Sequence, residues 1–465
     1  MDVKIIPGQL CGTVAAIPSK SQAHRALICA ALADDVTRVE CEGESEDILA
    51  TVACLSALGA GIVREPSAYV VQPMPHASMT APAVVSQTVE AGVPLMLPCG
   101  ESGSTFRFLL PIVGALGRSV SFLPLGRLPQ RPLSPLYEEL VRHGCTLSPQ
   151  GAVPFYAAGK LAPGSYTLDA GVSSQFVSGL LFALPLLDGD SELRLTGRIE
   201  SFPYIEMTLA MLDMFQIEAH FSDRVFAIPG GQVYRSPGTA RVEGDWSNAA
   251  FWLTAGALGA VRGALGAAHR SEAHDGAEGA DTDAADGAEG ARVVTCTGLA
   301  LQSHQGDRGI LDILTAFGAS VAAGDAAVAV SGGKLRSVEV DARDIPDLVP
   351  ILAVAAALAD GVTAIHNAGR LRTKESDRLT AVTDLLCGLG ADVRESADAL
   401  HIHGGRPLTG GEVSSWGDHR IVMAATIAAT MCSAPVVIRG AEAVNKSYPS
   451  FFNDLQALGG KYEIL

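Results

Sequence analysis

The chain repeats one pattern six times, and this repetition constrains its fold more than any other feature. In each copy a polar cluster opens a helix rich in alanine and leucine, as in "SKSQAHRALICAALA" and "DHRIVMAATIAAT". The copies recur about every 70 to 100 residues, which is long enough for two helices with strands between them. One residue from each cluster marks its place: Lys20, Gly103, Ser173, Trp246, Asp347 and Asp418.

A second repeated phrase consists of a helix end, a small residue and a strand, as in "LSALGAGI" and "ILTAFGASV". The small residue is expected in the left-handed conformation that ends many helices, which glycine adopts most easily. The third copy, "MLDMFQIEA", has Gln216 at this place. The two phrases follow the same intervals, so they describe one repeated unit of mixed α/β (α+β) structure.

The six alanine-rich helices are apolar on most sides, so we expect them inside the protein rather than on its surface. Six units divide into two lobes of three, and the seam is predicted at Pro237 and Gly238, between the third and fourth units. We therefore expect an N-terminal lobe over 19–238 and a C-terminal lobe over 239–465. The lead strand within 1–18 should complete the C-terminal lobe.

One gap between copies is long because of an insert. Residues 267–294 are biased to alanine, glycine, aspartate and glutamate and have no apolar period. Such a composition cannot bury enough apolar surface to fold. The sequence predicts an acidic disordered loop there, and a solvated spacer is a simpler interpretation than a metal or protein site.

The bulk charge limits the possible partners. A formal net charge of −17 argues against a nucleic-acid or membrane-surface binder, although a cleft can still be locally positive and bind a small anion. Nine scattered cysteines without a CxxC pair fit a reducing cytoplasm. The start "MDVKIIPGQL" resembles neither a signal peptide nor a transit segment, and the uncharged run 421–438 contains threonines and a proline. We expect a cytoplasmic protein that does not cross a membrane.

Against this acidic background, the stretch "GRLRTKESDRL" (369–379) concentrates four basic side chains. Several buried helices also open with cations or hydroxyls, and helix amino ends suit phosphate and carboxylate groups. Taken singly, such residues are more often helix caps or solvated charges. Their recurrence at one repeat interval favours a shared anion-binding face over six separate caps.

The motifs resemble those of the 3-phosphoshikimate 1-carboxyvinyltransferase (EPSP synthase) family of enolpyruvyl transferases over essentially the whole chain. They occur in the family's order: "PSKSQAHRAL", "GESGSTFR", "QRPLSPL", "DAGVSSQF", "ESFPYIEMT", "EGDWSNAAF", "DIPDLVPILAV", "RTKESDRL", "GDHRIVMA" and "NKSYPSFF". The resemblance implies two lobes, each of three βαββαβ repeats with buried helices (an inside-out α/β barrel), joined by a hinge. It also implies transfer of the enolpyruvyl group of phosphoenolpyruvate to the 5-hydroxyl of shikimate 3-phosphate, with release of phosphate.

The resemblance assigns roles to individual residues. Asp347 is implied as the base for the hydroxyl and Glu375 as the carboxyl for proton transfer at the methylene carbon, with Lys20 and Lys446 as further candidates. Phosphoenolpyruvate would be bound by Lys20, Gly103, Arg131, Gln175, Arg378, Arg420 and Lys446. Shikimate 3-phosphate would be bound by Ser21, Arg25, Ser173, Ser174, Gln175, Ser201, Tyr204, Asp347 and Lys374. Lysines and arginines would supply the positive charge, so no metal or cofactor is expected. The partners expected are these two small molecules, without nucleic acid, and the chain is expected to be a monomer.

Three alternatives stay open at the level of sequence. The nearest is UDP-N-acetylglucosamine 1-carboxyvinyltransferase, which would be expected to read Lys-Asn at the first helix and to carry a reactive loop cysteine. Here that helix reads Lys20–Ser21, and Cys99 is the cysteine closest to a motif loop. A serine hydrolase using Ser102 is the second, because "GESGS" nearly matches a nucleophile elbow. A non-catalytic binding protein is the third, although paired acids among many cations favour turnover.

Overall fold

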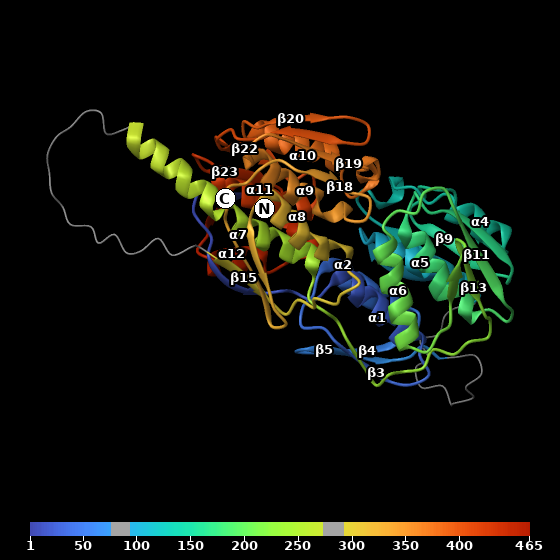
Figure 1. Cartoon of the computed structure of the whole chain (residues 1–465). Coiled ribbons are helices and arrows are strands. Elements are labelled where there is room, and N and C mark those ends of the chain that lie inside the picture. The colour runs from blue at the N-terminus through green and yellow to red at the C-terminus, as the bar shows by residue number, and fades with distance from the viewer. Residues whose placement is uncertain (76–93, 273–292) are drawn as a thin grey trace. The chain divides into compact units, whose positions relative to one another are not determined.

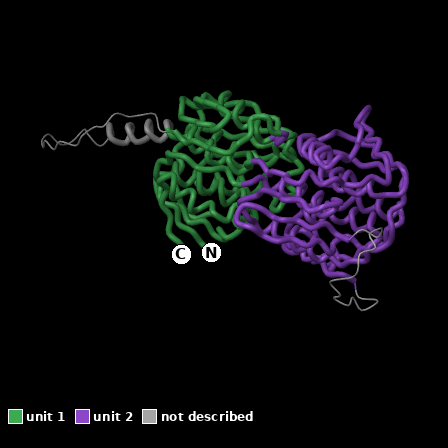
Figure 2. Tube along the Cα trace, turned by 90° about the horizontal axis from the view of Figure 1, so that it is seen from below, with its two compact units in different colours: residues 1–17, 244–303, 307–465 green, residues 18–243, 304–306 purple. Residues whose placement is uncertain are grey.

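The computed structural model describes residues 1–75, 94–272 and 293–465, and for residues 260–272 it describes the backbone alone. The described chain forms two compact units, coloured separately in Figure 2. Unit 1 comprises residues 1–17, 244–303 and 307–465, and unit 2 comprises residues 18–243 and 304–306. Each unit contains three four-stranded sheets.

All six sheets share one strand order, which the sheet of β10–β13 illustrates. Strand β10 (Ser165–Asp169) runs parallel to β11 (Ser191–Thr196), and the helix α5 (Ser174–Ala183) connects them. After a second helix, β12 (His220–Ser222) and β13 (Val225–Ile228) form an antiparallel hairpin, and β13 pairs with β11. The mixed α/β class and the three repeats in each unit agree with the predicted fold.

The order of elements within a repeat corrects the expected βαββαβ pattern. The three repeats that contain β6–β9, β10–β13 and β18–β21 run β–α–β–α–β–β along a continuous chain, so one strand separates the two helices. The other three sheets have the same pairing, but β14, β2 and β1 come to them from distant parts of the sequence. The reason lies in strand pairing, because parallel neighbours need a long crossover whereas antiparallel neighbours need only a turn. In the continuous repeats, the first two strands are parallel and are joined through a buried helix, and the last two form the hairpin.

Unit 2 contains three sheets, with strand orders β14-β3-β5-β4, β6-β7-β9-β8 and β10-β11-β13-β12. The strands not yet given are β3 (Thr37–Glu40), β4 (Gly61–Glu65), β5 (Ala68–Gln72), β6 (Leu95–Gly100), β7 (Val120–Pro124), β8 (Cys145–Leu147), β9 (Phe155–Gly159) and β14 (Thr239–Arg241). The other helices are α1 (Lys20–Leu32), α2 (Glu46–Ala57), α3 (Gly103–Ala115), α4 (Leu136–Arg142) and α6 (Phe202–Met214), with short 3-10 turns η1 (Leu128–Gln130) and η2 (Leu184–Leu186).

Unit 1 contains the sheets β22-β23-β1-β24, β16-β17-β15-β2 and β18-β19-β21-β20. Its strands are β1 (Val3–Ile6), β2 (Gly12–Ala15), β15 (Val293–Thr297), β16 (Ser320–Ala323), β17 (Ala327–Ser331), β18 (Glu339–Asp341), β19 (Val362–His366), β20 (Asp392–Glu395), β21 (Leu400–His403), β22 (Gly411–Ser414), β23 (Val436–Arg439) and β24 (Lys461–Ile464). Its helices are α7 (Trp246–Glu272), α8 (Ile310–Phe317), α9 (Val349–Leu358), α10 (Arg378–Gly388), α11 (His419–Met431) and α12 (Phe451–Ala457), with 3-10 turns η3 (Gly306–Gly309), η4 (Pro346–Leu348), η5 (Gly369–Thr373) and η6 (Ala441–Lys446).

The chain passes from unit 1 to unit 2 after residue 17, returns after residue 243, and enters unit 2 again only for residues 304–306. Strands from distant parts of the sequence complete two sheets of unit 1. Strand β1 lies between β23 and β24, and β2 runs parallel to β15. In unit 2, β14 runs parallel to β3. Each unit is therefore assembled from segments that are not contiguous in sequence.

The alanine-rich helices form the interior of each unit. Every residue of α9 and of α11 is buried, and these two helices pack against each other and against α7 (Figure 1). In unit 2, Ser104 is the one residue of α3 that is not buried, and Gln175 is the one such residue of α5. The alanines allow the close helix packing, and the accessible residues of these helices lie at their amino ends.

The predicted helix starts agree with the structure. Helix α1 begins at Lys20, α3 at Gly103 and α7 at Trp246, and Ser173 and Asp418 are the N-caps of α5 and α11. The side chains of both caps accept a hydrogen bond from a backbone N–H two residues later. The capping interpretation is therefore also correct at these positions.

The predicted helix ends are confirmed as well. All six small-residue positions have a positive φ, including Gln216 at 59°. The other five are Gly59, Gly144, Gly318, Gly390 and Gly459. A residue with a Cβ is strained in this conformation, so Gln216 departs from the pattern at an energetic cost.

Helix α7 corrects the predicted start of the acidic insert. The helix continues to Glu272, beyond residue 267 where the loop was expected to begin. Alanine-rich sequence has a high helix propensity, which explains the extension. The rest of the expected loop lies largely outside the described residues. Among the described residues, no helix combines the length and hydropathy that a bilayer-spanning helix needs.

Replacing Gln216 with glycine is expected to raise the free energy of unfolding by about 0.5–1 kcal/mol, because glycine adopts the positive φ without a Cβ clash. Urea unfolding monitored by circular dichroism measures the change. Gly318→Gln is the matched reverse variant and should lower stability, since a Cβ at Gly318 would lie 2.7 Å from the carbonyl oxygen of Lys334. Equal stability of Gln216→Gly and the parent would contradict the prediction.

Candidate active site

In unit 1, a buried arginine joins three carboxylates. Arg378 is 1% exposed, and its Nε donates to Oδ2 of Asp418 at 2.8 Å. Its Nη1 donates to Oδ1 of Asp347 and its Nη2 to Oε2 of Glu375, both at 2.7 Å. Each nitrogen of the guanidinium therefore has a carboxylate partner, and the group is fixed in one orientation.

The local sequence explains why these residues meet. Arg378 is the first residue of α10, Asp418 is the N-cap of α11, and Asp347 lies in η4, directly before α9. The amino ends of three helices of unit 1 therefore come together at Arg378. Such ends carry partial positive charge, which stabilises the carboxylates and would equally stabilise a bound anion.

Further cations surround Asp347. Arg420 donates from Nη2 to Oδ2 of Asp347 at 3.0 Å, and its Nη1 lies 3.4 Å from the main-chain oxygen of Asp347. Nζ of Lys374 is 4.0 Å from Oδ1 of the same carboxylate. Lys446 donates to the carbonyl of Gly417 at 2.8 Å, next to the α11 cap. The structure thus brings together five of the six predicted residues of unit 1, and Lys446 lies beside them.

The charges and the burial of this cluster shift the pKa values of Asp347 and Lys374. Burial by itself would raise the pKa of Asp347, but Arg420, Lys374 and Arg378 hold it well below its usual value. Burial lowers the pKa of Lys374 to about 8, although Asp347 opposes the shift. Asp347 is therefore ionised and tightly held, and Lys374 can exchange a proton near neutral pH. A carboxylate in this state is a weak base until an anion takes over its cations.

In unit 2, a second group of predicted residues lies where α3 and α5 begin. Arg107 connects the two helices, because its Nη1 donates to Oε1 of Gln175 at 2.8 Å. Nε2 of Gln175 donates to Oγ of Ser104 at 3.0 Å. A Cβ at Gly103 would lie 2.8 Å from Nη1 of Arg131, so the guanidinium of Arg131 lies directly against the start of α3. Two guanidinium groups and a helix amino end in one place favour an anionic ligand.

The remaining predicted residues of unit 2 link α1 to its neighbours. Arg25 is 2% exposed and donates from Nε to Oγ1 of Thr208 at 2.8 Å and from Nη2 to the carbonyl of Tyr204 at 2.7 Å. Its Nη1 donates to the carbonyl of Ser21 at 2.6 Å. Burial lowers the pKa of Arg25 to about 10, which leaves it protonated at neutral pH. Arg25 therefore fixes the start of α1 against α6, and it presents Ser21 and Tyr204 together.

Lys20 and three serines complete this set. Nζ of Lys20 lies 2.7 Å from Oδ2 of Asp47, and both side chains are largely buried. The hydroxyl of Ser173 caps α5, and Ser174 is the next residue of that helix. Ser201 is buried and precedes α6 with a φ of +53°, which is rare for a residue with a side chain. Strain of this kind is common at ligand-binding positions.

Comparisons with known proteins agree with the motifs. The family model described as EPSP synthase (3-phosphoshikimate 1-carboxyvinyltransferase) matches residues 5–262 and 284–455. A 3-phosphoshikimate 1-carboxyvinyltransferase of Clostridium kluyveri is 39% identical over 463 residues, covering 99% of this chain and 98% of the relative. The enzyme of the same name from Clostridium acetobutylicum is 40% identical over 462 residues, covering 98% of this chain and 97% of the relative.

The chain belongs to the EPSP synthase family.

Solved structures show the same fold. EPSP synthase from Acinetobacter baumannii superposes with a TM-score of 0.75 at 23% sequence identity and full coverage of both chains. The enolpyruvyl transferase NikO from Streptomyces tendae gives a TM-score of 0.71 at 19% identity, covering 99% of this chain and 98% of that chain. The family and fold class predicted from the sequence are confirmed, and with them the class of enzyme.

The alternatives are less well supported. Ser102 is fully buried, and its Oγ accepts hydrogen bonds from the N–H and the hydroxyl of Thr105, so it caps α3 in this EPSP synthase family member. Burial raises the pKa of the Cys99 thiol to about 12, which suits an inert core cysteine. Neither residue has the accessibility that a hydrolase serine or a reactive loop cysteine needs.

Two arginines of the basic stretch donate hydrogen bonds to backbone carbonyls. Arg370 donates to the carbonyl of Arg343 at 2.6 Å. Arg372 pairs with Asp377, the cap of α10, and bonds the carbonyls of Ser396 and Ala397. They hold the loop that presents Lys374 and Arg378.

Three polar residues near Asp347 were not among the predicted site residues. Asp418 accepts the Nε hydrogen bond of Arg378, and its place in a polar helix start could have identified it. Ser247 and Asp307 form a buried pair, with the Ser247 hydroxyl donating to Oδ2 of Asp307. The carbonyl of Ser247 also lies 3.5 Å from Nη1 of Arg420. No sequence motif indicates that Asp307 would be close to the site.

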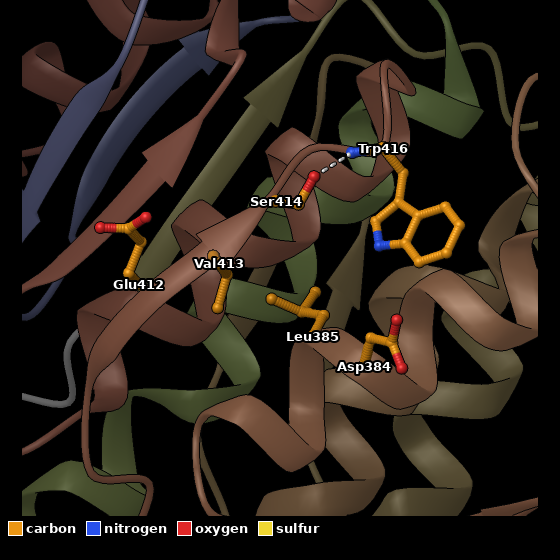
Figure 3. Close-up of a pocket in the computed structure, with 6 residues that line it drawn as sticks. All are labelled: Asp384, Leu385, Glu412, Val413, Ser414 and Trp416. Carbon is orange, nitrogen blue, oxygen red and sulfur yellow. Dashed lines mark hydrogen bonds between the residues drawn. The ribbon is translucent and has the colours of Figure 1, made fainter.

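A surface pocket of about 490 Å³ contains none of the predicted site residues (Figure 3). The side chains of Asp384 and Glu412 line it together with the ring of Trp416. Acidic groups would repel a phosphorylated substrate. This pocket is therefore a poor candidate for binding an anionic substrate.

Replacing Asp418 with alanine is expected to lower the free energy of unfolding by about 3–5 kcal/mol, because it leaves Arg378 buried without its Nε partner. Guanidinium unfolding monitored by fluorescence measures the loss. Asp377→Ala is the matched control, since Asp377 also caps a helix but pairs only with half-buried groups. It should cost about 1 kcal/mol. Equal losses in the two variants would show that Asp418 acts only as a cap.

Proposed function

We propose that the chain transfers the enolpyruvyl group of phosphoenolpyruvate to the 5-hydroxyl of shikimate 3-phosphate, with release of phosphate. The observation that carries the proposal is the contact of one ionised carboxylate, Asp347, with the cations Arg378, Arg420 and Lys374. The reaction needs both a base and cations for multiply charged substrates. This cluster supplies both, in a chain that belongs to the EPSP synthase family over nearly its whole length.

Binding of phosphoenolpyruvate would activate the base. We assign Arg378, Arg420 and Lys446 of unit 1 to the phosphate and carboxylate groups of this substrate. Arg378 and Arg420 hold the pKa of Asp347 down, so an anion that draws them away allows that pKa to rise. Asp347 then becomes a better proton acceptor when the substrate is present. The ionised carboxylate would accept a hydrogen bond from the 5-hydroxyl of shikimate 3-phosphate, and Lys374 would contact the same substrate.

The chemical step is an addition followed by an elimination. In the addition, the 5-hydroxyl oxygen bonds to the central carbon of phosphoenolpyruvate and its proton passes to Asp347. A second proton is delivered to the methylene carbon, which becomes a methyl group. In the elimination the phosphate leaves and the methyl group loses a proton, which restores the double bond. We assign the proton transfers at the methylene carbon to Glu375, with Lys20 and Lys446 as the other candidates.

The residues of unit 2 divide between the two substrates. We assign Lys20, Gly103, Arg131 and Gln175 to phosphoenolpyruvate, because they combine a helix amino end with two cations. For shikimate 3-phosphate we propose Ser21, Arg25, Ser173, Ser174, Gln175, Ser201 and Tyr204, which supply hydroxyls around a buried arginine. The proposal needs no metal or cofactor, since lysines and arginines carry the positive charge. We also propose that the chain works as a cytoplasmic monomer, with the passages near 18 and 238 acting as a hinge.

The test of this function is phosphate release from phosphoenolpyruvate. Release is expected with shikimate 3-phosphate as acceptor and not with UDP-N-acetylglucosamine. Mass spectrometry should detect 5-enolpyruvylshikimate 3-phosphate. Release that depends on UDP-N-acetylglucosamine instead would establish the alternative transferase.

Asp347→Ala and Lys20→Ala are each expected to leave a folded protein whose kcat falls by about 10²-fold or more, because each removes a group that contacts a reacting substrate. Steady-state kinetics measure the change, and circular dichroism checks the fold. Asp344→Ala is the control, since Asp344 lies three residues earlier and pairs with the half-exposed Arg343. Wild-type turnover in Asp347→Ala or in Lys20→Ala would refute the role assigned to that residue.

A further inference from the structure

Asp307 is a buried carboxyl group that none of the roles above uses. It lies in η3, just before α8, and its side chain is 2% exposed. A charged group at this depth is costly unless it is paired or takes up a proton. The groups that contact Asp307 therefore indicate its role.

The contacts of Asp307 lead to Arg420. The hydroxyl of Ser247 donates to Oδ2 of Asp307, and the carbonyl of the same serine lies 3.5 Å from Nη1 of Arg420. The positive charge of Arg420 also acts on the Asp307 carboxyl, because it lowers the pKa of that group. Arg420 also binds Asp347 through Nη2. Arg420 therefore interacts with two acids at once.

We propose that Asp307 is a positioning residue: together with Ser247 it holds Arg420 and sets how much positive charge Arg420 offers to phosphoenolpyruvate. When Asp307 carries a proton, it no longer offsets the charge of Arg420, whereas Asp347 still does. When Asp307 is ionised, two carboxylates offset that charge and the anion binds less tightly. The proposal rests on the assignment of Arg420 to phosphoenolpyruvate.

The charges that face Asp307, together with its burial, bring the pKa of Asp307 close to neutral pH. Burial raises the pKa of Asp307 to about 7, and the negative charges of Asp347 and Asp245 raise it as well. Arg420 and the hydrogen bond from Ser247 lower it. On the same short turn, Arg308 points its Nη1 to the carbonyl of Leu301. Asp307 therefore changes charge near neutral pH, while Asp347 stays ionised.

Asp307→Asn tests the proposal, because it keeps the shape of the side chain and removes the ionisation. The KM for phosphoenolpyruvate is measured from pH 6 to pH 8.5 in the wild type and in the variant. The KM values of the wild type and of Asp307→Asn should agree at pH 6. At pH 8.5 the wild-type KM should be roughly 5-fold larger than that of the variant. The ionisation of the substrate itself cancels in this ratio. The variant Asp312→Asn changes an exposed acid nearby and should follow the wild type at every pH.

Ser247→Ala supplies a second, independent arm. It removes the hydrogen bond that lowers the pKa of Asp307, so the rise in KM should begin at a higher pH than in the wild type. A parallel KM profile in wild type and Asp307→Asn would overturn the proposal. So would a pH-independent loss of kcat in Asp307→Asn with KM unchanged, because that result would place Asp307 in the chemical step.

A binding measurement separates this proposal from the proposed function. Isothermal titration with inorganic phosphate at pH 6 and pH 8.5 should show the same divergence between wild type and Asp307→Asn. If the wild type fails to turn over phosphoenolpyruvate with shikimate 3-phosphate, the proposed function is refuted and the phosphate titration still decides the role of Asp307. Equal phosphate affinity of the two proteins at both pH values would refute it.

The pH dependence of the melting temperature provides a further check, because the raised pKa of Asp307 fixes the direction of the change. The pKa of Asp307 is about 7 in the folded protein and about 4 in an unfolded chain. The stability that this group contributes is therefore complete below about pH 4 and is lost as the pH rises through 7. Asp307→Asn lacks this loss, so its melting temperature should rise relative to that of the wild type between pH 5 and pH 8.

Discussion

The pairing of the buried Arg378 with three carboxylates is the interaction on which the centre of unit 1 depends. A guanidinium cannot stay charged at this depth without partners, and each of its nitrogens has one. Buried ion pairs of this kind are seldom a net gain in stability over a well-packed apolar core. Here the pairs join the starts of α9, α10 and α11, so the charges that hold the three helices together are also those that we assign to the substrates.

The repeat allowed much of this architecture to be predicted. Six polar clusters mark six helix starts, and the alanine-rich segments after them are buried because they are apolar on every side. The predicted βαββαβ order of elements within a repeat was wrong. The periodicity of the sequence locates the helices, but it does not show which strands are parallel. The prediction of a loop at 267 was also wrong at its start, because an alanine-rich segment can extend a helix whatever its charge.

The site residues that lie within a sequence motif could be predicted, whereas those that only the fold brings close could not. Lys374, Glu375 and Arg378 belong to one motif. Lys374 and Arg378 contact Asp347, and Glu375 contacts Arg378, once the helix starts meet. The roles of Arg370 and Arg372 could not be predicted from the motif. Both are basic residues like Lys374 and Arg378, but in the structure both donate hydrogen bonds to nearby backbone carbonyls. Asp307 is separated from Ser247 by an insert and from Asp347 by one helix and three strands, so only the fold brings the three together.

The position of β1 has a consequence for synthesis of the protein. This strand is synthesised long before its two neighbours, β23 and β24, because both lie far downstream in the sequence. At about 5–20 residues per second, β1 must wait on the order of half a minute or longer for them. Unit 2 can fold during that time, because nearly all of it lies before residue 244. Loss of β24 would leave β1 paired with β23 but exposed at the edge of its sheet, and an open sheet edge invites aggregation.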